Sequence, residues 1–239
     1  MNVIVGYDGS DFSMQALDWA MDEAELRKLP LTVVHAWQWP YGEADAEAKL
    51  HLRKAAEHVL WHGADCVRHA SSVETVETDL YEGAASERLV ALSDQAELVI
   101  VGSRGMSGLP LAALGSVASQ VAAHARCPVV VVRGAGPLPS PAHPGPVVAT
   151  ETEEAVLDFA FREASMQRLP LLSLAPLPEL WRDRHPDVVA QTGRDIPPHA
   201  SLVVVSRTRH GHLGGLADRL LREAVCPVAV VPATMKKPS

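Results

Sequence analysis

The sequence predicts an α/β protein made of two tandem parallel-sheet domains, the second of them shortened. Two observations lead to this prediction. Short apolar runs alternate with stretches of helical periodicity over residues 1–133, as expected for parallel strands joined by right-handed helical crossovers. The same pattern then restarts at Val147, after a segment rich in proline and glycine, which indicates an internal duplication.

The composition excludes several classes of protein. Of the 239 residues, 47% are hydrophobic and 21% charged, which is typical of a globular protein. The formal net charge is −8, so a basic surface for nucleic acid is not expected. The opening MNVIVGYDGS lacks the regions of a signal peptide, and no apolar segment is long enough to span a membrane. The cysteines Cys66, Cys127 and Cys226 form no CxxC pair, so we expect a protein of the reducing cytoplasm, without membrane partners.

In the first repeat, apolar runs predict strands and helical spacing predicts the helices between them. The predicted strands are Asn2–Gly6, Leu31–Ala36, Val73–Leu80, Glu97–Val101 and Pro128–Val132. The predicted helices are Ser13–Leu29, Ala46–Arg68, Ala84–Ser93 and Gly115–Ala125. Residues 8–10 supply turn and capping side chains before the first helix, and Pro30 ends that helix.

Residues 134–146, GAGPLPSPAHPGP, predict a linker between a first domain at residues 1–133 and a second at 147–232. After the linker, Val147–Thr150 predicts a strand and Thr152–Leu169 a helix. Residues 202–205 then repeat residues 98–101, and Cys226–Val231 repeats Cys127–Val132. Both cysteines are expected to be small buried hydrophobic residues.

The distances between repeated landmarks show where the second repeat is shorter. Pro30 and Pro170 are 140 positions apart, and Leu98 and Leu202 are 104 apart. About 36 residues are therefore missing between the second and fourth strands of the second repeat. About 5 more are missing from the segment that follows, because the two Cys-Pro pairs are 99 positions apart. We expect the larger loss to remove a strand or a helix.

A glycine-punctuated loop follows the fourth predicted strand. Gly102 and Gly105 come first, and after nine residues Gly115 and Ser116 begin a helix. Glycine can take positive φ and has no Cβ, so a ligand could lie against bare backbone. The N–H groups of Gly115, Ser116 and Val117 would face a phosphate at the positive end of the helix dipole. No Gly-Lys-Ser/Thr follows, so this is not a P-loop, and a tight turn without ligand stays the alternative.

The spacing Gly-x2-Gly-x9-Gly-Ser resembles the nucleotide loop of the ATP-binding universal stress proteins. With both repeats considered, the chain resembles a tandem member of that family, over residues 1–133 and, in eroded form, 145–232. The resemblance implies a parallel sheet of order 3-2-1-4-5, of the adenine-nucleotide alpha-hydrolase-like type. Nucleotide would then lie at the carboxyl ends of the first and fourth strands, where the topology switches.

The resemblance also implies a set of nucleotide-binding residues. Asp8 would accept a bond from a ribose hydroxyl, and its alternative role is that of a turn residue. Backbone groups at Ala36 would read the adenine edge, whereas the neighbouring His35 is expected to be a core residue. Arg104 would screen phosphate charge or be solvated. The complete expected set is Gly6, Asp8, Ala36, Gly102, Gly105, Gly115, Ser116 and Val117.

The expected function is that of a stress or dormancy protein that binds ATP, with or without Mg²⁺, and regulates a protein partner. No catalytic constellation is recognised, and the sequence RHGH at residues 209–212 is too little for a metal site. Two alternatives stay open. One is a nucleotide-free stress scaffold or dimerisation protein, and the other, less favoured, is a slow ATPase or adenylating enzyme. An adenylating enzyme would need a Ser-Gly-Gly or HxGH signature, and residues 7–10 carry neither.

The resemblance further implies that the fifth strands of the two repeats meet antiparallel, which covers an exposed sheet edge. This would make the chain an intramolecular pseudo-dimer, with or without further homodimerisation. The second repeat is expected to bind no nucleotide. Its residues 149–152 (ATET) stand where the first repeat has YDGS, Ser206 stands in place of Gly102, and Asp218 would repel phosphate.

Overall fold

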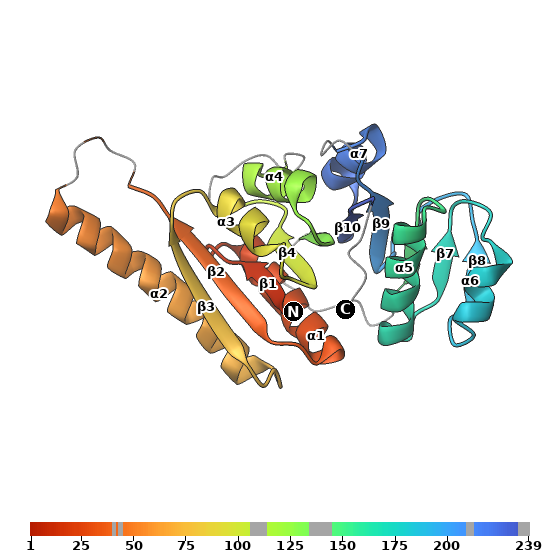
Figure 1. Ribbon diagram of the computed structural model, residues 1–239, viewed down its shortest axis with the longest axis horizontal. Coiled ribbons are helices and arrows are strands. Elements are labelled where there is room, and N and C mark those ends of the chain that lie inside the picture. The colour runs from red at the N-terminus through yellow and green to blue at the C-terminus, as the bar shows by residue number, and fades with distance from the viewer. Residues whose placement is uncertain (40–41, 43–44, 106–113, 134–144, 209–212, 234–239) are drawn as a thin grey trace.

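The computed structural model describes the chain except for residues 40–41, 43–44, 106–113, 134–144, 209–212 and 234–239 (Figure 1). Three predicted features therefore lie outside the described residues. They are most of the linker, the middle of the glycine-punctuated loop, and the histidine-containing segment at residues 209–212.

The N-terminal half, residues 1–133, follows the predicted order of strands and helices. Its strands are β1 (Val3–Gly6), β2 (Leu31–Trp37), β3 (Val76–Glu82), β4 (Leu98–Gly102) and β5 (Val129–Val132). Its helices are α1 (Asp11–Arg27), α2 (Ala46–Ala70), α3 (Ala85–Leu92) and α4 (Ser116–His124). The bounds differ from the prediction by three residues at most. The helix α2 extends beyond the sheet at the end of the molecule (Figure 1).

The C-terminal half, residues 145–233, keeps a full set of strands but loses helix. Its strands are β6 (Val147–Ala149), β7 (Leu171–Ser173), β8 (Ala190–Thr192), β9 (Leu202–Ser206) and β10 (Val228–Val231). Its helices are α5 (Glu154–Gln167), α6 (Glu179–Arg184) and α7 (Gly215–Glu223). The deletion therefore removed helix and eliminated no strand, although β7 and β8 have 3 residues each where β2 and β3 have 7. The helix α6 has 6 residues where α2 has 25, and no helix joins β8 to β9 across residues 193–201.

All ten strands form one sheet of order β3-β2-β1-β4-β5-β10-β9-β6-β7-β8. Each half has the order 3-2-1-4-5 that the family resemblance implied, with parallel pairing inside the half. The strands β5 and β10 pair antiparallel, with Val130 opposite Ala229, as predicted. We call this pair of strands the seam. It removes the edge that each half would otherwise expose.

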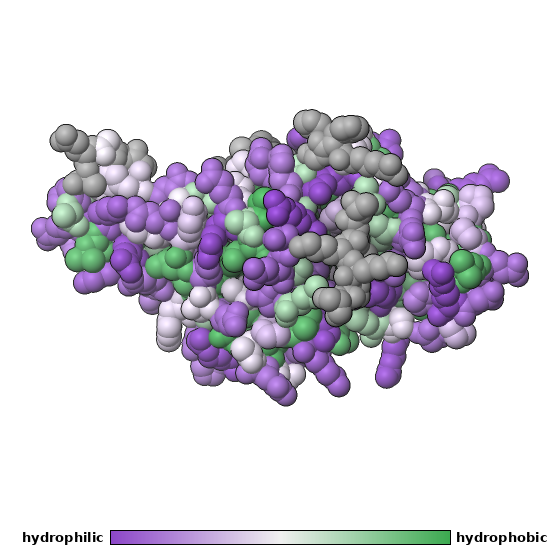
Figure 2. All heavy atoms as spheres, in the orientation of Figure 1, coloured by the Kyte–Doolittle hydropathy of each residue, from purple (hydrophilic) through white to green (hydrophobic). Residues whose placement is uncertain are grey.

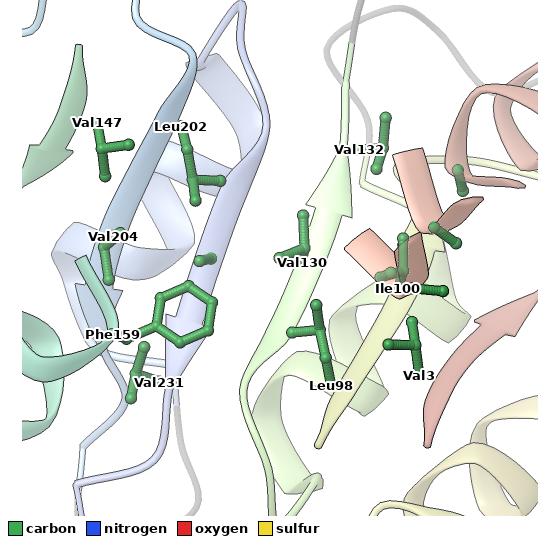
Figure 3. Close-up of a cluster of buried hydrophobic side chains, with 14 of the residues drawn as sticks. Val3, Leu98, Ile100, Val130, Val132, Val147, Phe159, Leu202, Val204 and Val231 are labelled. Atoms are coloured by element: carbon green, nitrogen blue, oxygen red, sulfur yellow. The ribbon is translucent and has the colours of Figure 1, made fainter. Parts of the chain in front are cut away.

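Helices cover both faces of the sheet, and each face has a core that continues across the seam. The helices α1, α2, α5 and α6 cover one face and α3, α4 and α7 the other (Figure 1). On the first face, Val3 and Val130 belong to the same apolar cluster as Val204 and Val231 of the other half (Figure 3). Burial on both faces explains why the strands read as nearly uninterrupted apolar runs.

Two of the three cysteines are buried, as expected, and the face of the molecule in Figure 2 is mainly polar. Hydrophilic residues dominate the face in Figure 2, with hydrophobic residues scattered among them. Cys127 and Cys226 are buried, and burial raises the pKa of their thiols to about 12 and about 11, so both stay protonated at neutral pH. No helix within the described ranges combines the length and apolar character needed to cross a bilayer.

The helices α1 and α5 meet at a buried ionic cluster, which consists of Glu23, Arg27, Glu97, Glu163 and Gln167. Arg27 Nε lies 3.0 Å from Glu23 Oε2, and the same guanidinium pairs with Glu163 and lies 3.7 Å from Glu97 Oε1. Gln167 Nε2 donates to Glu23 at 3.0 Å and to Glu163 at 3.2 Å. Glu23 and Glu163 are almost fully buried, and burial raises the pKa of both, to about 8 for Glu23. Two buried carboxylates therefore share one close arginine.

Candidate functional site

A pocket of about 350 Å³ opens at the carboxyl ends of β1, β2 and β4, beside the N-termini of α3 and α4. In an open α/β sheet, this crevice between the first and fourth strands is where ligands bind. All the residues of the predicted set line the pocket: Gly6, Asp8, Ala36, Gly102, Gly105, Gly115, Ser116 and Val117. The fold thus brings together residues from four separate segments. Their role toward a ligand stays a prediction.

Two helix N-termini border this pocket. The helix α3 begins at Ala85 and α4 at Ser116, and both residues line the pocket. Neither helix has a side-chain cap, because its N-cap residue is Ala84 or Gly115. By contrast, the side chain of Ser10 caps α1. The uncapped N–H groups and the positive dipole ends of α3 and α4 therefore favour an anion in the pocket.

Asp8 forms the turn that the sequence left open as its alternative role, and its role toward a ribose stays a prediction. Its Oδ1 accepts bonds from the backbone N–H of Ser10 at 3.0 Å and from the Ser10 hydroxyl at 2.5 Å, which is an Asx turn before α1. The turn needs Gly9, whose φ of +81° favours glycine. Asp8 also lines the pocket. The turn thus orients a carboxylate at the mouth of the crevice.

Tyr7 holds the end of β1 in place through contacts that the sequence did not reveal. His35 Nδ1 lies 2.8 Å from the Tyr7 carbonyl oxygen, so Nδ1 carries the proton, because a carbonyl only accepts. The Tyr7 hydroxyl pairs with Nδ1 of His62 on α2 at 2.8 Å, and burial raises the pKa of Tyr7 to about 12. Gly63 leaves room for the ring, since a Cβ there would lie 2.6 Å from it. These partners are far apart in sequence, so no local pattern signalled them.

The glycines of the loop allow close packing of the chain on itself. A Cβ on Gly102 would lie 2.6 Å from the carbonyl oxygen of Phe12, and one on Gly105 would lie 2.5 Å from Asp8 Oδ2. A Cβ on Gly115 would come within 3.3 Å of the preceding loop backbone. None of the three has a positive φ. The expected positive φ is therefore wrong for these glycines, and the absence of a Cβ lets the chain pack closely on itself. That a ligand lies against their backbone stays a prediction.

The charges in the pocket suit an anion better than a metal. Among the described lining residues, Arg104 is the only arginine or lysine and Asp8 the only carboxylate. The Arg104 guanidinium lies over the ring of Phe12, 4.0 Å from its centroid, which orients the cation. No group of three or more His, Cys, Asp or Glu suited to a metal occurs in the part of the chain that the structure describes.

At the corresponding position of the C-terminal half, a side-chain carboxylate joins two strand ends by hydrogen bonds. Strand pairing aligns Leu202 with Leu98, so Ser206 stands at the position of Gly102, as predicted. The Glu151 carboxylate accepts bonds from the Ser206 N–H and hydroxyl, both at 3.0 Å, and thus bridges the ends of β6 and β9. The strand register aligns Glu151 with Tyr7, two positions from the alignment expected from sequence.

The fold and the pocket place the chain among α/β proteins with a ligand crevice at the topological switch point. The family model described as the universal stress protein family matches residues 1–133. The chain belongs to this family.

Some of its relatives match over nearly the whole length of both chains. A universal stress protein of Mycobacterium tuberculosis is 32% identical, with 96% of this chain and 95% of the relative covered. One of Mycolicibacterium smegmatis is 29% identical, with 96% of each covered. The solved structure of a universal stress protein from Archaeoglobus fulgidus matches 97% of this chain and 96% of its own, with a TM-score of 0.69 and 16% identity, and thus shares the fold.

Proposed function

We propose that the N-terminal half binds an adenine nucleotide, ATP with or without Mg²⁺, and that its occupancy regulates a protein partner. One observation carries the binding proposal. Every residue of the set implied by the family's nucleotide loop lines a single pocket of about 350 Å³, together with two uncapped helix N-termini. Regulation of a partner, in a cytoplasmic stress response, rests on membership of the family and on the small number of titratable groups in the pocket.

The residues present fit the parts of such a nucleotide. The Asp8 carboxylate can accept a bond from a ribose hydroxyl, and the backbone at Ala36 lies at the end of β2 for the base. The N–H groups at Ser116 and Val117 and the guanidinium of Arg104 suit the phosphates. Since Asp8 is the one carboxylate among the described lining residues, Mg²⁺ would be held mainly by phosphate and water.

Each chain is proposed to hold one nucleotide. In the C-terminal half, the internal contact between Glu151 and Ser206 crosses the strand ends where a ribose would lie, and its carboxylate would repel phosphate. Asp218 adds a second negative charge in the first turn of α7. The proposed role of the C-terminal half is structural: it pairs with β5 at the seam and contributes side chains to the shared core.

The test compares the same substitution at the corresponding N-caps of α4 and α7. In Gly115→Val, the new side chain meets the backbone of residues 103–104, so the phosphate loop must shift. In the matched control Gly214→Val, the nearest atom is a side-chain methyl of Thr208 at 3.1 Å. We expect Gly115→Val to weaken ATP binding about tenfold or more in titration calorimetry, and Gly214→Val to bind like the wild type, at one ATP per chain.

Other outcomes would favour the alternatives. Equal binding by wild type and Gly115→Val would show that the site is assigned wrongly. A wild type that binds no ATP, ADP or AMP, and carries no nucleotide by mass spectrometry after purification, would favour a nucleotide-free scaffold. Steady release of phosphate from bound ATP would favour a slow ATPase.

A further inference from the structure

Arg207 of the C-terminal half forms hydrogen bonds with α4 of the N-terminal half. It directly follows β9, and its Nη1 donates to the carbonyl oxygens of Ala123 at 2.8 Å and Ala125 at 2.7 Å. These carbonyls lie at the C-terminal end of α4. The contact is possible because antiparallel pairing at the seam brings the carboxyl ends of β9 and β10 beside the start of β5, where α4 ends.

The other end of α4 lies in the pocket. The helix has 9 residues, and Ser116 and Val117 in its first turn line the proposed phosphate site. We infer that Arg207 is a positioning residue for this site, which acts through α4 from across the seam. The inference rests on the proposed function and adds to it the route by which the C-terminal half controls nucleotide affinity.

The position of Arg207 argues that this contact belongs to the fused chain. Strand register aligns Arg207 with Ser103 of the N-terminal half, one residue after the aligned pair Ser206 and Gly102. The Ser103 side chain is too short for such a reach, and its carbonyl accepts a bond from the Gly115 N–H at 2.8 Å inside the pocket loop. Two copies of the N-terminal half would therefore have no arginine at this position. The half in which Glu151 bridges the strand ends thus carries an arginine that contacts the helix bordering the other half's pocket.

The dipole of α4 makes the contact with Arg207 favourable. The last carbonyls of a helix have no partner within it and carry the negative end of its dipole, so a cation there stabilises the helix. Arg207 is half-buried, and desolvation lowers its pKa from the usual arginine value, yet it stays charged at neutral pH. A cation at the C-terminus and a phosphate at the N-terminus favour the same helix position. Binding at one end must therefore stabilise binding at the other.

A contact in the reverse direction lacks this consequence. Arg133, which follows β5, donates from Nη2 to the carbonyl oxygen of Arg222 at 2.8 Å, near the end of α7. The helix α7 starts at Gly215 in the C-terminal half, whose strand ends are bridged by Glu151. Of the two contacts, only that of Arg207 is made with a helix whose other end lines the pocket.

The experiment measures ATP affinity by titration calorimetry and thermal stability on the full chain. Arg207→Met keeps much of the side-chain stem but removes the charge and the donors, and Arg207→Lys restores the charge. The matched control is Arg162→Met, which removes a different contact between the halves, with Glu97 at 2.7 Å. Within the described residues, Arg162 forms no ion pair or hydrogen bond with α4. We expect Arg207→Met to bind ATP about three- to tenfold more weakly, Arg207→Lys to recover part of this loss, and Arg162→Met to bind like the wild type.

Amide hydrogen exchange distinguishes an effect of Arg207 on the position of α4 from an effect on the stability of the whole protein. In the wild type, ATP should slow amide hydrogen exchange in β9 and β10 across the seam, and Arg207→Met should lose most of this effect. The inference is overturned if the wild type binds ATP and Arg207→Met binds it equally well, or if Arg162→Met loses as much affinity as Arg207→Met. Absence of ATP binding by the wild type would instead refute the proposed function, on which this inference depends.

Discussion

The two halves of the chain share a sheet but differ at the carboxyl ends of their strands. Both have five strands in the order 3-2-1-4-5, and both end their first helix at a left-handed residue, Lys28 or Arg168, with φ of 54° and 55°. The N-terminal half has a pocket where β1 and β4 end. At that place the C-terminal half has a hydrogen-bonded bridge from Glu151 to Ser206.

The difference teaches that the sheet and the pocket depend on separate parts of the sequence. The loss of sequence shortened β7 and β8 to 3 residues each, where β2 and β3 have 7, but kept the strand order. The strands nearest the seam, β9 and β10, keep the lengths of β4 and β5, because both are buried in the shared core. The pocket depends on a few loop residues, which can change at little cost to the core. The C-terminal half can therefore lose a ligand site and still support the fold.

The largest effect on the free energy of unfolding is expected at the seam, where a strand of each half pairs with a strand of the other. Val130 is fully buried in β5 opposite Ala229, so Val130→Asp would bury an unpaired charge in the shared core. We expect a loss of about 4 kcal/mol or more in the free energy of unfolding, measured by urea denaturation. The control Val189→Asp, at a site 65% exposed, should change stability little. A well-folded Val130→Asp protein would show that the halves are independent.

A smaller effect is expected from the buried ionic cluster between α1 and α5. The pKa of Glu23 is raised to about 8 in the folded state, above its value near 4.5 when unfolded, so the folded state binds the extra proton between these values. Stability should therefore fall as the pH rises from about 5 to 8, by about 2 kcal/mol or more. Glu23→Gln should flatten this part of the profile, whereas the exposed Glu57→Gln should not. An equally steep profile in Glu23→Gln would contradict the assignment.

The smallest effects compare the carboxylates at the two crevices. Asp8→Asn should weaken ATP binding about tenfold, because it replaces the proposed acceptor for the ribose hydroxyl. Glu151→Gln should leave ATP binding unchanged and lower stability by about 1 kcal/mol, through its weakened bonds to Ser206. Calorimetry and urea denaturation on both variants give this comparison directly. A second ATP bound by Glu151→Gln would show that the C-terminal crevice is blocked by that charge alone.

Most of the fold could be predicted from the sequence because it depends on local periodicity. Apolar runs such as residues 98–101 mark buried strands, and their recurrence at residues 202–205 marks the duplication. The glycine spacing was sufficient to name residues that the fold brings into one pocket. The positive φ expected for these glycines is wrong, because the backbone conformation of a loop depends on which segment packs beside it.

The sequence by itself thus determined the strands and helices of the first repeat and the recurrence of its most apolar strands, since each of these rests on neighbours within a few residues. It did not reveal β8 or α6, which are short and lack a clear apolar pattern. Only the tertiary structure decided which side chains meet across long distances. The pairs Tyr7 with His62, Arg27 with Glu163 and Arg207 with Ala125 each join segments that no periodicity connects. Their contacts arise because the seam and the shared core bring two surfaces together, and a surface is a property of the folded chain.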